Sequence, residues 1–178
     1  TQVDGVFYQI RSDGKVYPVS DTAMTPFAST VFFRPTLTRV LPGPLPDVAA
    51  LEAMIDALRP PNLPCALRIT GEFAYVKTRA VPAQTKPYPR LVEVAKTQPT
   101  FEFADVTGVL VGFWLPKDFS GLNVPGYHVH FLTADRSGGG HLLDVRPRRV
   151  TVELQPLRQF QLILPEKIEQ IGEGMGVE

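Results

Sequence analysis

All the histidines of this chain, His128, His130 and His141, lie in one short segment, residues 126–141, which reads GYHVHFLTADRSGGGH. Side chains two positions apart point to the same face of a β-strand, so His128 and His130 would project together, about 6 to 7 Å apart along the chain. The glycines before His141 permit unusual backbone angles and a tight reversal. The segment therefore predicts a β-hairpin in which His141 returns opposite His130 and all the imidazoles meet at one point.

This histidine hairpin has the composition of an open metal site. Three neutral imidazoles form a common ligand set of catalytic zinc, and related sets bind iron, copper or manganese. One alternative is that the histidines are separate residues on a sheet face. Another is a structural zinc site, but such sites usually take four protein ligands with thiolates prominent, and the single cysteine, Cys65, is remote in sequence. We therefore expect an open, reactive site.

Charged side chains elsewhere could complete such a site. The candidate carboxylates are Glu72, Glu93, Asp135, Asp144, Glu153 and Glu178, and their order in the sequence does not rank them. Lys77 and Arg79 share one face of a strand-like run. An inward arginine is costly to bury unless it meets an anion, whereas the alternative is an exposed face with two solvated cations.

Composition excludes several classes of function. The formal net charge is zero, so the chain lacks the basic excess that nucleic-acid binding demands. The longest apolar run, about residues 106–115, is too short to span a bilayer, so we expect no membrane partner. One cysteine excludes an internal disulfide. No secretion signal begins the chain, which favours the cytoplasm, with secretion as the alternative.

The expected elements are mostly strands. Residues 6–19 form a hairpin around Ser12–Lys15, because Asp-Gly tolerates a tight turn. Asp47 caps a helix that stops before Pro60. A second short helix is expected at residues 90–98. Further strands are expected at residues 27–33, 65–76, 106–115, 126–133, 141–145, 150–154 and 160–164. The order predicts an α+β, β-rich fold of two mostly antiparallel or mixed sheets with a few short helices, divided into residues 1–105 and a metal-binding region, residues 106–178.

Three blocks of sequence resemble one enzyme family, the alpha-acetolactate decarboxylases. They read VDGVFYQIRSDGKVYPV, GEFAYVKTRAVPAQTKPYPRLVEVAKTQP and GVLVGFWLPKDFSGLNVPGYHVHFLTADRSGGGHLLD, and together they span nearly the whole chain. The resemblance implies two β-sheet domains, a homodimer, and one Zn2+ ion bound by His128, His130 and His141. It also implies that Arg79 contacts the substrate and that Glu178 completes the site as a metal ligand and catalytic residue. A second family glutamate would precede the first residue of this chain.

The activity that the resemblance implies is zinc-dependent decarboxylation of 2-acetolactate, a small 2-hydroxy-3-keto acid, to (R)-acetoin and CO2. Three histidines on a β scaffold would also serve another metal-dependent lyase, a hydrolase or an oxygenase. A non-enzymatic binding module stabilised by zinc is the remaining alternative. An open coordination position favours an enzyme, and a closed fourth ligand favours the module.

Overall fold

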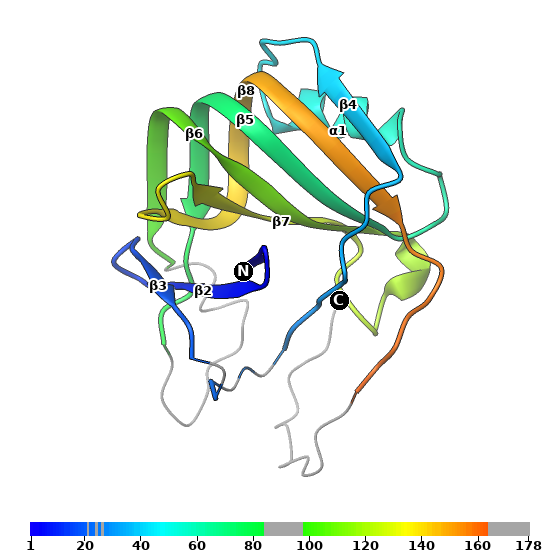
Figure 1. The fold of residues 1–178 in the computed structure, drawn as a ribbon, viewed down its shortest axis with the longest axis horizontal. Coiled ribbons are helices and arrows are strands. Elements are labelled where there is room, and N and C mark those ends of the chain that lie inside the picture. Colours follow the sequence, from blue (N-terminus) through cyan, green and yellow to red (C-terminus); the bar gives the residue numbers. More distant parts are fainter. Residues whose placement is uncertain (21, 24, 26, 84–97, 164–178) are drawn as a thin grey trace.

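The computed structural model describes residues 1–20, 22–23, 25, 27–83 and 98–163 (Figure 1). In chain order the elements are β1 (Gln2–Val3), β2 (Val6–Ile10), β3 (Val16–Pro18), β4 (Leu37–Leu41), α1 (Val48–Asp56), β5 (Cys65–Arg79), β6 (Thr100–Leu115), η1 (Lys117–Phe119), β7 (Gly126–Thr133) and β8 (Gly139–Pro156). Their pairings are antiparallel throughout. The expected β-rich α+β fold with two sheets is confirmed.

The larger sheet is strongly curved and closes on itself (Figure 1). Its strand order is β4-β8-β5-β6-β7, and β7 pairs again with β8. This closure depends on the length of β8, an 18-residue strand that pairs with β4 and β5 and then, at its first residues, with β7. Two of the expected strands, at residues 141–145 and 150–154, are therefore parts of one strand.

The main hydrophobic core lies on one face of this closed sheet. It includes Phe73, Leu110, Phe131 and Val152, each fully buried, and α1 adds Leu51 and Ile55. The expected cap of α1 is confirmed, because the Asp47 side chain accepts a hydrogen bond from the Ala50 N–H at 2.8 Å. The core leaves the opposite face of β6 and β7 to be covered by another part of the chain.

A smaller sheet of β1, β2 and β3 covers part of that opposite face. Val3 is 4% exposed and packs in a second apolar cluster with Val109 of β6 and Leu132 of β7. The β1–β2 turn consists of Asp4 and Gly5, with φ of 51° and 81°. Two successive positive φ angles are characteristic of a tight hairpin turn, so this dipeptide brings β1 back along β2.

Two expected strands are wrong. Residues 27–33 and the described part of residues 160–164 have no regular secondary structure. Several of their large apolar side chains are exposed, as in Phe32 at 92% and Ile163 at 80%, because no strand pairs with either segment. The helix expected at residues 90–98 lies almost wholly on residues 84–97, outside the described part of the chain.

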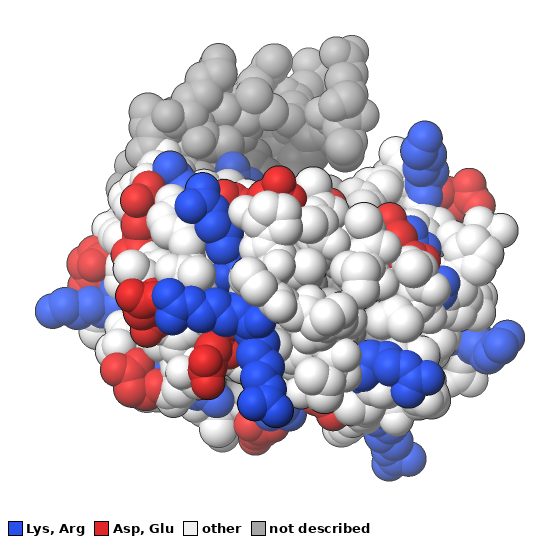
Figure 2. All heavy atoms as spheres, turned by 90° about the horizontal axis from the view of Figure 1, so that it is seen from above, with Lys and Arg blue, Asp and Glu red and all other residues white. Residues whose placement is uncertain are grey.

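Basic and acidic side chains are intermixed on the face of the molecule drawn in Figure 2. Lys77 lies 3.1 Å from Glu102, and Arg148 forms an ion pair with Asp105. This mixing agrees with the formal net charge of zero. Among the described residues, no helix combines the length and apolarity that crossing a bilayer requires.

Candidate metal centre

The three histidines come together on adjacent strands. His128 and His130 alternate along β7, and His130 pairs directly with His141 of β8. The ring centroids are 5.3 Å apart for His128 and His130, 5.0 Å for His128 and His141, and 5.4 Å for His130 and His141. One ring nitrogen from each residue lies within 4.8 Å of the other two. The predicted cluster is therefore present in the fold.

The alternation of β7 explains why the imidazoles face away from the core. Val129 and Phe131 point into the main core, so His128 and His130 project from the other face. Gly112 of β6 allows the two strands to approach here, because a Cβ at this position would lie 2.1 Å from the His128 carbonyl oxygen. β7, which carries two of the histidines, is thus held by core packing on one face and by β6 at its edge.

Arg79 lies beside the histidines, as the sequence pattern suggested it could. It pairs with His141 in the β5–β8 register, so the row across three strands reads His130, His141, Arg79. Its positive charge contributes to lowering the pKa of each histidine in the group. Within the described residues, no ion pair or hydrogen bond engages its guanidinium, in contrast to the partly exposed Lys77, which pairs with Glu102.

Burial keeps the imidazoles neutral. Desolvation is the largest cause in each case: it lowers the pKa of His130 to about 3, with further contributions from His141 and His128. Burial and then Arg79 lower the pKa of His141 to about 4, and the same two causes lower the pKa of His128. Because neutral imidazole has a free lone pair on one nitrogen, all these groups are ready to act as ligands near neutral pH.

The donor set fits a divalent transition metal ion. Ligand nitrogens about 2.1 Å from one zinc ion can be at most about 4.2 Å apart. The limit of 4.8 Å on the observed separations is close to this, and rotations of the rings would remove the difference. Among the described residues the group contains imidazoles alone, which leaves at least one coordination position open to water or substrate.

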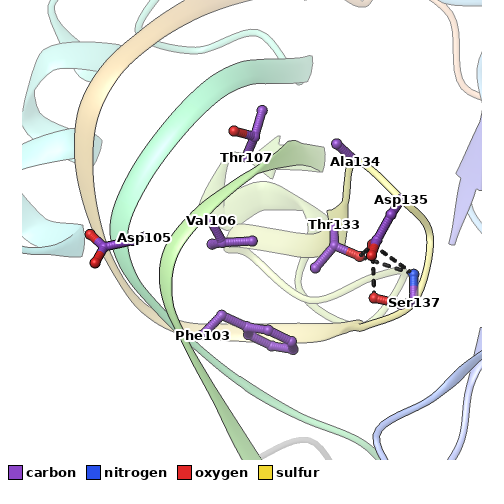
Figure 3. Close-up of a pocket in the computed structure, with 8 residues that line it drawn as sticks. All are labelled: Phe103, Asp105, Val106, Thr107, Thr133, Ala134, Asp135 and Ser137. Atoms are coloured by element: carbon purple, nitrogen blue, oxygen red, sulfur yellow. Dashed lines mark hydrogen bonds between the residues drawn. The ribbon is translucent and has the colours of Figure 1, made fainter.

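The candidate carboxylates lie elsewhere or outside the described residues. Asp135 accepts hydrogen bonds from Thr133 and Ser137 in the β7–β8 turn, beside a surface pocket (Figure 3). These bonds lower its pKa to about 2 and tie its carboxylate to the turn. The other described candidates are not in the histidine group either: they are Glu72, which is exposed, Asp144, which accepts from Val48 N–H, and Glu153, which lies near Arg68. Glu93 and Glu178 lie outside the described residues.

One neighbour of the histidines, Thr1, was not predicted from the sequence. The Oγ1 atom of Thr1 lies 2.8 Å from Nδ1 of His130, a hydrogen bond between residues 129 positions apart. No local pattern signals such a contact, because it depends on how the small sheet packs against β7. The Asp-Gly dipeptide at residues 4–5 could have indicated the turn that brings β1 to this place.

Comparison with known proteins places this geometry in a family. The family model for alpha-acetolactate decarboxylase matches residues 1–171. The chain belongs to the alpha-acetolactate decarboxylase family. An alpha-acetolactate decarboxylase from Methylococcus capsulatus is 46% identical over 163 residues, which cover 91% of this chain and 62% of that protein. One from Bacillus licheniformis is 43% identical over 162 residues, which cover 91% of this chain and 64% of that protein. The chain thus spans less than two thirds of the length of these relatives.

Solved structures of alpha-acetolactate decarboxylases and similar proteins share this fold. The acetolactate decarboxylase of Bacillus subtilis subspecies spizizenii superposes with a TM-score of 0.88 at 40% identity, covering 92% of this chain and 71% of that one. A Staphylococcus aureus protein described as similar to alpha-acetolactate decarboxylase gives a TM-score of 0.85 at 32% identity, covering 89% of this chain and 68% of that one. The close superposition shows that the curved sheet carrying the histidines is the family's fold.

Proposed function

We propose that this chain forms the active site of a zinc-dependent decarboxylase that converts 2-acetolactate into (R)-acetoin and CO2. The observation that carries the proposal is the convergence of His128, His130 and His141 beside Arg79, whose guanidinium has no ion pair or hydrogen bond among the described residues. The chain belongs to the alpha-acetolactate decarboxylase family. Neutral ligands leave the charge of a bound ion largely available to the substrate. This suits a reaction in which negative charge develops on an oxygen atom.

The reaction breaks one carbon–carbon bond. The carboxylate leaves as CO2, its bonding electron pair stays on the carbon that carried it and spreads into the adjacent ketone, and a proton then adds to that carbon. A zinc ion held by the three imidazoles would supply Lewis-acid stabilisation of the charge on the ketone oxygen. The chain's own residues would bind the carboxylate, orient it and deliver the proton.

Arg79 is the residue that we assign to the substrate carboxylate. A guanidinium binds a carboxylate through two parallel hydrogen bonds, which fixes the plane and position of the departing group. Too tight a grip would stabilise the ground state and slow the loss of CO2, so orientation is the main contribution. We assign delivery of the proton, and a further contact to the ion, to Glu178, which lies outside the described residues. Catalytic zinc can expand to five ligands, so this contact would still leave a position for the substrate.

The activity is tested by incubating purified, zinc-loaded protein with racemic 2-acetolactate. We expect CO2 and acetoin to form in equal amounts, with the (R) enantiomer of acetoin dominant on chiral chromatography. Removing the metal with a chelator, verified by elemental analysis, should return the rate to the spontaneous one, and added zinc should restore it. Undiminished activity after complete metal removal contradicts the proposal. Activity that requires iron and consumes oxygen would favour an oxygenase instead.

Substituting Arg79 with lysine tests the orienting role. Lysine keeps the positive charge but loses the planar pair of donors, so we expect kcat to fall by roughly 100-fold, the scale on which misplacement of a substrate by about 1 Å acts. Zinc affinity should stay near the wild-type value, because the imidazoles are unchanged. Steady-state kinetics and zinc titration measure the two effects. The matched control is Lys77→Arg on the same strand, and a fully active Arg79→Ala protein would refute the assignment.

We also propose that the protein forms a homodimer. Several large apolar side chains of the described residues are exposed, including Phe32 at 92% and Ile163 at 80%. Exposed apolar surface of this kind is characteristic of protein–protein contacts. Sedimentation equilibrium should give twice the chain mass of 19.7 kDa, and a monomer at all concentrations would contradict this.

A further inference from the structure

The small sheet reaches the metal centre through its first residue. The Oγ1 atom of Thr1 lies 2.8 Å from Nδ1 of His130. The backbone of Thr1 is itself fixed, because its N–H donates to the Tyr8 carbonyl at 2.9 Å and its carbonyl accepts from the Tyr8 N–H at 2.8 Å. Among the hydrogen bonds of the described residues, this is the one that engages an imidazole of the group.

We propose that Thr1 is a positioning residue of the metal centre, which fixes the tautomer and the ring orientation of His130. The inference rests on the metal centre of the proposed function. A neutral imidazole carries its proton on one nitrogen and a lone pair on the other. When Nδ1–H of His130 donates to the Thr1 hydroxyl oxygen, the lone pair is on Nε2, which is then the atom left to bind the ion. Groups that orient metal-bound histidines in this way also raise the basicity of the ring.

Packing of the small sheet holds Thr1 in place. Val3 is buried in one cluster with Val109 and Leu132, and Leu132 follows His130 by two positions on the same face of β7. The apolar contact that fixes β1 therefore lies directly beside the histidine that Thr1 touches. A displaced β1 would expose Val3, so the position of the hydroxyl is tied to the burial of an apolar side chain.

An ion pair fixes the turn of the same hairpin. Asp4 accepts a hydrogen bond from Nη1 of Arg68 at 2.9 Å. Arg68 of β5 pairs with Val111 of β6, which pairs with His130 of β7, so the anchor and the histidine lie in one row across the sheet. The side chains of Arg68 and Asp4 are 32% and 60% exposed, so solvent weakens this pair and it assists the packing of Val3 rather than replacing it.

Thr1→Val tests the proposal, because valine keeps the shape of threonine and removes the hydroxyl. We expect zinc affinity, measured by competition with a chromophoric chelator, to fall by about 10- to 100-fold, the usual cost of losing such an outer contact. The 15N NMR signals of the zinc-loaded protein should show that Nδ1 of His130 has lost its hydrogen-bond partner. Thr1→Ser keeps a hydroxyl and should restore both readouts. Thr38→Val, on an exposed position of β4, is the matched control and should change neither.

The possible outcomes distinguish failure of the positioning role of Thr1 from failure of the proposed decarboxylase function. A Thr1→Val protein with wild-type zinc affinity and unchanged His130 signals overturns the positioning role and leaves the metal centre standing. A wild-type protein that binds zinc but does not act on 2-acetolactate overturns the proposed reaction, while the affinity comparison still decides the role of Thr1. A wild-type protein that takes up no zinc overturns both. Thermal melting of each variant shows whether a loss of affinity comes from unfolding, and an equal loss in Thr1→Ser would also refute the assignment.

Discussion

Replacing His130 with alanine is expected to abolish tight zinc binding and leave the fold intact. His130 is central to the group, since it alternates with His128 on β7 and pairs with His141 across the hairpin. Losing a direct ligand should cost more than the roughly 100-fold that marks the upper end for outer contacts. The imidazole is not part of the main core, so removing it leaves the packing of Val129 and Phe131 unchanged. Zinc titration and elemental analysis measure the loss.

The same protein should remain folded. We expect its melting temperature, measured without metal, to lie within about 4 °C of the wild-type value, a shift that corresponds to roughly 1 kcal/mol for a chain of this size. Leu143→Ala, an exposed position on β8 two residues beyond His141, serves as the control and should bind zinc normally. A His130→Ala protein that still holds one zinc ion per chain at wild-type affinity would contradict the assignment of the site.

The histidine cluster could be predicted because it depends on two local rules. Residues two apart share a face of a strand, and a glycine-rich turn returns the chain to its neighbour. The same kind of rule correctly gave the turn at Asp13-Gly14, where Gly14 has φ of 78°, and the helix capped by Asp47. In each case the determining residues lie within one short stretch of the chain, so the sequence order contains the necessary information.

The two strands that were predicted but do not form show the limit of those local rules. Residues 27–33 have the apolar character of a strand, yet a strand also needs a free partner edge. Groups in and beside the segment have other partners: the backbone N–H of Arg34 donates to the Gln155 side chain, and the Ser29 hydroxyl accepts from the Asn123 side-chain amide. The edge of β8 is already occupied by β4, a strand that the sequence pattern did not predict. Pairing is a property of the assembled sheet, and periodicity alone does not contain it.

The neighbours of the metal centre depend on the same long-range assembly. Sequence periodicity could place Arg79 on a strand, but its position next to His141 requires β8 to pair with both β5 and β7. The hydroxyl of Thr1 reaches His130 because the small sheet packs on that face. For Arg79 the family resemblance implied a place against the substrate, which the pattern alone left open. For Thr1 neither the pattern nor the resemblance gave a signal.

Replacing Phe131 with alanine should destabilise the fold and leave zinc binding intact, which is the opposite of what we expect for its neighbour His130. Phe131 is fully buried, and its ring packs edge-on against Phe73 and at a tilt against Phe103, with centroids 5.6 Å apart in both pairs. Removing such a ring leaves a cavity and costs about 3 to 5 kcal/mol of unfolding free energy. For a chain of this size we expect the melting temperature to fall by on the order of 10 °C. Urea unfolding with the metal chelated measures the cost without a contribution from ligand binding.

Phe32→Ala is the matched control for this substitution. Phe32 is 92% exposed and outside any strand, so the same loss of a benzyl group should change the unfolding free energy by less than about 0.5 kcal/mol. Below its melting temperature the Phe131→Ala protein should still bind one zinc ion, because its imidazoles project from the other face of β7. Equal destabilisation by the two phenylalanine variants would contradict the placement of the core. Loss of zinc from folded Phe131→Ala would show that the faces of β7 are not independent, and that core packing itself sets the geometry of the histidines.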